Sequence, residues 1–83
     1  MPYLEKSRRE AIAGKEISPS TPGDINYIVT QLCQEYLELC GEKYLTYNDL
    51  IGALECCKLE LYRRKTAIYE DKKIRENGDV WMS

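Results

Sequence analysis

The sequence predicts an all-α fold: an antiparallel helical hairpin with a short N-terminal helix, assembled into a homo-oligomeric helical bundle. Two long stretches carry apolar residues at helical spacing, and helix-starting and helix-stopping residues bound both of them. The stretches differ in length, which leaves part of the longer one without a neighbour. All 83 residues, 1–83, are predicted to form one domain, and a chain this short buries only about 60–65% of the surface of its unfolded form. Self-association would therefore stabilise it.

The first predicted element is a short helix over residues 3–13. Apolar residues lie at both of its ends, and Gly14 weakens it because glycine loses the most conformational freedom on folding. The stretch SPSTPG that follows, residues 18–23, breaks any helix because it combines two prolines with a glycine. The short helix is therefore separate from the elements that follow.

The next helix is predicted over residues 22–40. Thr21 is a good N-cap, and Pro22 suits the first helical position because its missing N–H would have no helical partner there. Gly41 is a natural C-cap. Between these ends the apolar residues recur at helical spacing: Ile25, Ile28, Val29, Leu32, Tyr36, Leu39 and Cys40.

A longer helix is predicted over residues 47–76, after a link that contains EKYL. Thr46 is the expected N-cap, and the Asn-Gly pair at Asn77 is the expected stop. Residues 77–83 form a tail in which Trp81 suggests docking, either on this chain or on a neighbouring copy. The apolar stripe of the long helix consists of Leu50, Ile51, Leu54, Cys57, Leu61 and Ile68.

The unequal helix lengths predict an overhang. The first long helix would measure about 28 Å and the second about 45 Å, so in a hairpin the second extends past the first by roughly ten residues. Either the N-terminal segment or a second copy of the chain could cover the exposed apolar groups, and we expect both to do so. The apolar residues of the overhang are Ala67, Ile68, Tyr69 and Ile74.

The charge distribution restricts the classes of partner. The net charge is −2, which gives no global basic field for nucleic acid. Residues 58–75 nevertheless hold seven basic residues against three acidic ones, a local net of +4. No apolar run approaches the roughly 20 residues that a membrane span needs, and the N-terminus lacks the apolar core of a signal peptide. We therefore expect a cytoplasmic protein whose cysteines are reduced.

The residues present do not suggest an enzyme. The chain has no histidine, no glycine-rich phosphate loop and no Cys-x-x-Cys motif. The four cysteines are expected to be buried free thiols, with a zinc site as the alternative. Carboxylates on the long helix could bind a metal, but helical spacing favours ion pairs from Glu60 to Arg64 and from Asp71 to Arg75 instead.

The stretch ELYRRKTAIYEDKK, residues 60–73, is the candidate binding surface. Tyrosine rings would stack on an aromatic base while cations hold phosphates. The alternative is that the tyrosines pack at a subunit interface and that the lysines are solvated, since Tyr and Arg are enriched at interfaces. In an uninterrupted helix, steps of four, three, four and four place five residues in one stripe: Lys58, Tyr62, Lys65, Tyr69 and Lys73.

The beginning of the shorter helix is predicted to complete this site. In a hairpin, Asn26 and Tyr27 would lie near the basic overhang, where the positive end of the helix also attracts anions. Asn26 would donate or accept hydrogen bonds, unless it belongs only to a frayed first turn. The cations expected to hold phosphates are Arg63, Arg64 and Lys73, and the rings expected to stack are Tyr27, Tyr62 and Tyr69.

Several motifs resemble those of a family of short, uncharacterised proteins found in bacteria and their phages. The motifs are INYIVTQL…YL, LECCKLELYRR, YEDKKI and ENGDV, and the likeness is strongest over residues 50–80. The family has no established activity, so the resemblance implies no catalytic residue. In size, helicity and expected assembly, the chain is also similar to very short helical phage proteins that sequester nucleotide-derived immune signals. This second likeness is one of type and not of matched motifs.

Together these inferences predict a non-enzymatic protein that sequesters an anionic, nucleotide-derived ligand at a subunit interface. It would act as a phage anti-defence protein in the cytoplasm of a bacterial host cell. The predicted partners are further copies of the chain and the small molecule, without membrane, nucleic acid, metal or cofactor. One alternative is an adaptor or inhibitor of a host protein, using acidic surfaces and the tail DVWMS. The other is a carboxylate–metal hydrolase.

Overall fold

The structure is a computed structural model that describes residues 5–7, 10 and 18–81. These residues are mostly helical, and no strand occurs among them, so the predicted all-α class is confirmed. Most of the helix predicted over residues 3–13 lies outside the described residues, although Lys6, Ser7 and Glu10 are helical. The long elements are α2 (Pro22–Cys40), α3 (Tyr44–Leu61), the π-helical turn η1 (Tyr62–Thr66) and α4 (Ala67–Asn77).

Helix α2 has the bounds that the sequence indicates, and its first turn is closed by side chains. The Thr21 hydroxyl accepts a hydrogen bond from the Asp24 backbone N–H at 3.1 Å. The Ser20 backbone N–H and hydroxyl donate to Asp24 Oδ2 at 3.0 and 3.1 Å, and they lower the pKa of the Asp24 carboxyl below its ordinary value. Gly41 ends the helix with φ +89°, a conformation that favours glycine.

The second arm begins at Tyr44, three residues before the predicted start, and Thr46 is not its N-cap. The N-cap is Lys43, whose carbonyl accepts from the Tyr47 backbone N–H at 3.1 Å. The Tyr47 hydroxyl also donates to Glu42 Oε1 at 3.1 Å, which ties the helix to the turn and raises the pKa of Tyr47. The turn after Gly41 is therefore shorter than the sequence suggested, and Thr46 is buried inside the first helical turn.

A π-helical turn interrupts the long helix at η1, which the sequence did not predict. The Ala67 backbone N–H bonds to the Tyr62 carbonyl, five residues back instead of four. Such a turn contains one more residue than an α-helical turn. Side chains after it are therefore rotated by about 100° relative to an uninterrupted α-helix. Turns of this kind are rare and are found frequently at functional sites.

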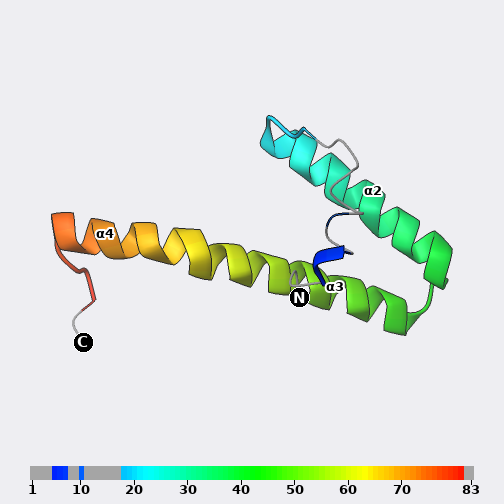
Figure 1. The fold of residues 1–83 in the computed structure, drawn as a ribbon. Coiled ribbons are helices and arrows are strands. Elements are labelled where there is room, and N and C mark those ends of the chain that lie inside the picture. The colour runs from blue at the N-terminus through cyan, green and yellow to red at the C-terminus, as the bar shows by residue number, and fades with distance from the viewer. Residues whose placement is uncertain (1–4, 8–9, 11–17, 82–83) are drawn as a thin grey trace.

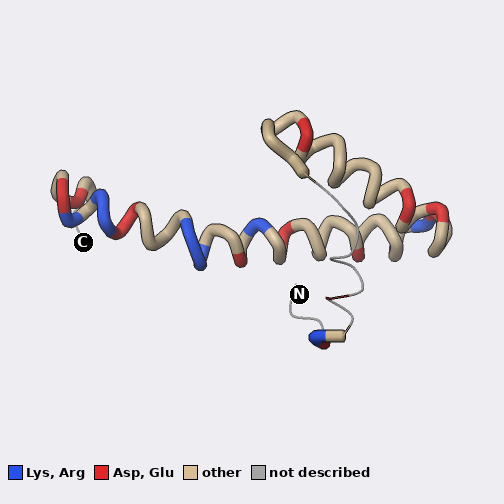
Figure 2. The backbone as a smooth tube through the Cα atoms, turned by 45° about the horizontal axis from the view of Figure 1, so that its top comes forward, with Lys and Arg blue, Asp and Glu red and all other residues tan. Residues whose placement is uncertain are grey.

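The two arms diverge from the turn at Gly41–Lys43, as Figures 1 and 2 both show. Helix α2 contacts α3, but within the described part of the chain it contacts neither η1 nor α4. The Cα radius of gyration is 17.1 Å, whereas a compact chain of 83 residues would have about 12 Å. The far half of the long helix therefore extends without α2 or any other described helix packed alongside it.

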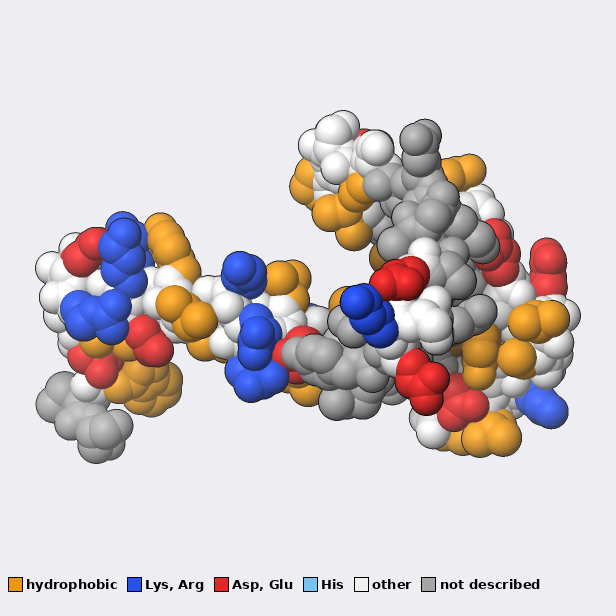
Figure 3. All heavy atoms as spheres, in the orientation of Figure 1, with side chains coloured by type: hydrophobic (Ala, Val, Ile, Leu, Met, Phe, Trp, Pro, Cys, Tyr) orange, Lys and Arg blue, Asp and Glu red, His pale blue; other side chains and the backbone are white. Residues whose placement is uncertain are grey.

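A single chain has no hydrophobic core among the residues that the structure describes. No hydrophobic side chain there is buried, and Thr46, at 3% exposure, is the one buried residue. Figure 3 shows hydrophobic side chains on the surface of both arms. The chain exposes 7776 Å², against about 5,100 Å² for a compact protein of 9.7 kDa. The excess is roughly 2,700 Å² per chain, or roughly 5,400 Å² for two chains, and the largest obligate interfaces bury a total of about 5,000 Å² or more.

Two further predictions about burial can be compared with the structure. All four cysteines are free thiols, but only Cys33 is half-buried, and Cys40, Cys56 and Cys57 are exposed because no second layer of helices covers them. The N-terminal segment that was expected to cover the overhang lies largely outside the described residues.

Among the helices that the structure does describe, none combines the length and apolar character required to cross a bilayer.

Candidate functional site

The cations of the predicted surface are concentrated on the π-helical turn. Arg63, Arg64 and Lys65 are consecutive there, and the neighbouring Tyr62 is 54% exposed. Arg63 Nη2 lies 2.7 Å from Glu60 Oε1, so an ion pair and hydrogen bond hold this guanidinium. Neither Arg64 nor Lys65 has a carboxylate within ion-pair distance among the described residues. These two exposed cations are the ones most available to an anion.

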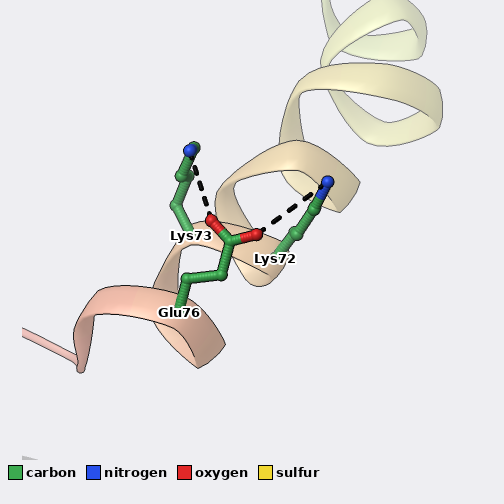
Figure 4. A network of polar contacts seen from close by, with 3 residues as sticks. All are labelled: Lys72, Lys73 and Glu76. Carbon is green, nitrogen blue, oxygen red and sulfur yellow. Dashed lines mark hydrogen bonds and ion pairs between the residues drawn. The ribbon is translucent and has the colours of Figure 1, made fainter.

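Lys73, predicted to hold a phosphate, is already paired. Its Nζ lies 3.2 Å from Glu76 Oε2, while Lys72 Nζ approaches the other oxygen of Glu76 at 3.9 Å (Figure 4). The Lys73 ammonium also lies 5.5 Å from the centroid of the Tyr69 ring, a cation–π distance. Tyr69 and Lys73 are therefore brought together, as the sequence indicated. Lys73, however, has less free charge for a ligand than Arg64 or Lys65.

The predicted stripe through Tyr62 and Tyr69 assumed an uninterrupted α-helix and does not hold. Because η1 contains an extra residue per turn, the face of Tyr62 continues eight residues later and not seven. The structure accordingly places Tyr62 on the same hollow as Glu70 and Ile74, while Tyr69 is absent from its lining. Tyr62 and Tyr69 thus belong to different faces of the arm.

A hollow of about 430 Å³ lies between α4 and the tail that follows it. Gly78, with φ +86°, redirects the chain after α4, and the Trp81 backbone N–H donates to Asp79 Oδ1 at 2.9 Å. The charged side chains of the hollow are Lys73, Glu70 and Asp79, an acidic balance that does not suit a phosphate. The lining residues are Tyr62, Glu70, Lys73, Ile74, Asn77, Gly78, Asp79, Val80 and Trp81.

Asn26 and Tyr27 lie on the other arm, apart from the cations. Their helix, α2, does not contact η1 or α4, so the prediction that one chain brings them near the overhang is wrong. The reason is the divergence of the arms, which separates the N-terminal end of α2 from the long helix (Figure 1). The Asn26 carbonyl accepts from the Thr30 hydroxyl at 2.8 Å, and the Tyr27 side chain is 66% exposed.

Neither of the two predicted carboxylate pairings, Glu60 with Arg64 and Asp71 with Arg75, occurs in the structure. Glu60 pairs with Arg63, three residues away, and no ion pair joins Asp71 to Arg75. Glu55 instead pairs with Lys58, at 3.0 Å. No group of three or more His, Cys, Asp or Glu side chains in the described part of the chain is placed to hold a metal ion.

Sequence reasoning missed part of the arrangement. Lys65 was assigned to the Tyr/Lys stripe but not to the phosphate-holding cations, although it follows Arg63 and Arg64 directly. Trp81 was noted as a docking residue, but its place beside Tyr62 in a hollow depends on the turn at Gly78. The sequence analysis assumed α-helical spacing through residues 62–66, so it did not identify η1 or the change of face that follows it.

Comparisons with known proteins add the family but no activity. No curated protein and no solved structure matches the chain. One family model covers both arms, the π-helical turn and the beginning of the tail. The predicted membership of an uncharacterised family is confirmed. With residues 1–80 matched, the chain belongs to the family described as a domain of unknown function (DUF6899).

Proposed function

We propose that this protein is a non-enzymatic homo-oligomer that sequesters a small anionic, nucleotide-derived ligand at an interface between its copies. The setting would be the cytoplasm of a bacterial cell, where a phage uses the protein against host defence. The observation that carries the proposal is the π-helical turn, where Arg64 and Lys65 have no carboxylate partner among the described residues and lie beside the exposed ring of Tyr62.

The chemistry of this turn suits a nucleotide. An arginine guanidinium can donate two parallel hydrogen bonds to a phosphate, and a lysine adds a compact positive charge. Tyr62 offers a ring face for a base. Lys72 and Lys73 share Glu76, so their charge is largely used within α4. We therefore assign the leading role to Arg64 and Lys65 and a supporting role to Arg63, which Glu60 holds in place.

The assembly part of the proposal is supported by the missing core. A chain that exposes roughly 2,700 Å² more than a compact monomer would gain stability by burying apolar surface against another molecule, which supports this part of the proposal. An antiparallel helical bundle made of several copies would provide that burial, and it would bring basic turns from different copies into one assembly. The tyrosines and the acidic arm α2 would then lie at the interfaces.

The test begins with a thermal-shift screen of ribonucleoside mono- and triphosphates and 3′,5′-cyclic mononucleotides, since a ligand of the native state raises the melting temperature. For a compound that does so, calorimetric titration should show at least a roughly tenfold weaker affinity for Arg64→Gln, because an arginine–phosphate bond contributes about 1.5–3 kcal/mol.

The matched control is Lys58→Gln, which removes a cation already paired with Glu55 and lying before the turn. This variant should bind like the wild type. A screen in which no nucleotide shifts the melting temperature would contradict the proposed ligand class. Equal affinities for Arg64→Gln and the wild type, in intact oligomers, would contradict the assignment to the π-helical turn.

A second candidate function, an adaptor that binds a host protein, is favoured by the tail. Val80 and Trp81 are 90% and 81% exposed, and large exposed aromatic residues are typical interface anchors. If this candidate holds, a protein that co-purifies from bacterial lysate with the wild type should be lost with Trp81→Ala. Nucleotides should then leave the melting temperature unchanged.

A further inference from the structure

The far half of the long helix matches α2 in length. Residues Tyr62–Asn77 form η1 and α4, and among the described elements α2 contacts neither of them. Their 16 residues span about 24 Å, and the 19 residues of α2 span about 28 Å. One α2 helix would therefore cover this uncovered half almost completely, but the α2 helix of the same chain diverges from it (Figure 1).

The two surfaces also carry opposite charge, as Figure 2 shows along the tube. Helix α2 contains no Lys or Arg, and its charged residues are Asp24, Glu35 and Glu38. The segment η1–α4 has six basic residues against three acidic ones. Complementary charge of this kind steers association and fixes the register of two surfaces.

We propose that two copies form a two-fold symmetric dimer in which the long helices lie antiparallel and α2 of each copy packs on η1–α4 of the other. A two-fold contact is reciprocal, so both uncovered halves are covered at once and the assembly closes. In this dimer, residues of both copies would form the ligand-binding site. That statement about the ligand rests on the proposed function.

The register of α2 on the partner's η1–α4 can be counted from the C-terminal ends of the two helices. In this dimer α2 runs parallel to the partner's α4, and both helices end at a glycine C-cap, at Gly41 and Gly78. Aligning those ends places Asn26, 14 residues before Cys40, level with Arg63, 14 residues before Asn77. The partner's Asn26 and Tyr27 therefore reach the basic turn that their own chain keeps away from them.

The same register pairs opposite charges. Glu35 and Lys72 each lie five residues before the end of their helix, and Glu38 and Arg75 each lie two residues before it. In the part of one chain that the structure describes, neither Glu38 nor Arg75 takes part in an ion pair. Glu38 belongs to the end of α2 beside the turn and Arg75 to the far end of α4, so only a second copy can bring them together (Figure 1).

A second copy of the chain in this position would also cover exposed apolar side chains. At the level of the hollow beside Trp81, the partner would present the end of its α2 and its turn, where Leu39 and Tyr44 are 85% and 82% exposed in the single chain. Burial of these side chains, together with Ile68 and Ile74 of α4, would supply part of the missing core.

The first experiment reverses the paired charges and measures dimer dissociation by sedimentation equilibrium without ligand. Glu38→Arg and Arg75→Glu should each raise the dissociation constant by at least about tenfold, because each change acts twice in a two-fold dimer. The double variant should return to within about threefold of the wild type. Glu5→Arg, an exposed charge reversal outside the contact, should leave the constant unchanged.

The second experiment uses a chain whose four native cysteines are replaced by serine. Adding both Glu38→Cys and Arg75→Cys should give a disulfide-linked dimer on mild oxidation, and either cysteine alone should not. A wild-type monomer, a double charge reversal as weak as the single ones, or no cross-link in a chain that still dimerises would each overturn this arrangement. Because both readouts are free of ligand, a failed nucleotide screen would refute the proposed function and leave the dimer standing.

Discussion

If the protein assembles as proposed, diluting it from about 100 μM to about 1 μM should lower its melting temperature, because assembly would supply the apolar burial that the described residues of one chain lack. If a dimer unfolds directly to two unfolded chains, hundredfold dilution costs RT ln 100, about 2.7 kcal/mol. Two chains of 83 residues gain about 0.35 kcal/mol/K of unfolding entropy, at roughly 2.1 cal/mol/K per residue. The ratio predicts a fall of about 8 °C.

Circular dichroism at 222 nm can follow this change, with path lengths adjusted so that both samples absorb equally. The reasoning depends on the absence of buried hydrophobic side chains among the described residues. A melting temperature constant within about 1 °C would show that single chains fold by themselves, and it would refute the inference from exposed area. Leu32→Glu, which places a charge on an apolar position of α2 that is 52% exposed, should lower both melting temperatures.

Two further predictions concern single residues. Gly41→Ala and Gly78→Ala should each lower the free energy of unfolding by about 1–2 kcal/mol in thermal melts at fixed concentration, because both glycines have positive φ. Gly23→Ala, at an ordinary backbone angle, is the control and should not lower it. Equal effects at all three positions would contradict this. Asp24→Asn should lower stability at pH 7. The pKa of Asp24 is lowered in the folded chain, so its carboxylate stabilises the fold at a pH above the ordinary pKa of 3.8. This stabilisation is lost as the pH falls through the folded pKa, so the wild type and Asp24→Asn should become equally stable in acid. A stability difference that persists in acid would contradict that origin.

Local signals in the sequence were sufficient for the ends of α2. Thr21, Pro22 and Gly41 act through short-range sterics and hydrogen bonds, which do not depend on the rest of the fold. The start of α3 was placed three residues late, because Thr46 has the side chain of a good N-cap and the short turn overrides that signal. Thr46 is buried at the base of the two arms, and a local N-cap pattern does not predict such burial.

The candidate site was predictable in composition but not in geometry. The run from Tyr62 to Lys65 marked the basic surface correctly, because consecutive cations are read directly from the chain. Which tyrosine shares a face with which cation depended on η1, and no spacing rule reveals an extra residue in a turn. The distance between Asn26 and Arg63 depended on the angle between the arms. That angle is set by packing, and in the dimer proposed above a second copy of the chain would supply part of the packing surface.

Assembly and ligand binding should therefore be linked in this protein. If the basic turn of one copy and Asn26 of the other form one site, a ligand bound there stabilises the dimer, and the dimer binds the ligand more tightly than a monomer by the same factor. Arg63, Arg64 and Lys65 also repel one another on a single turn, and an anion between copies would relieve that repulsion. The charge that weakens the isolated arm is then the charge that makes the assembled protein selective for an anion.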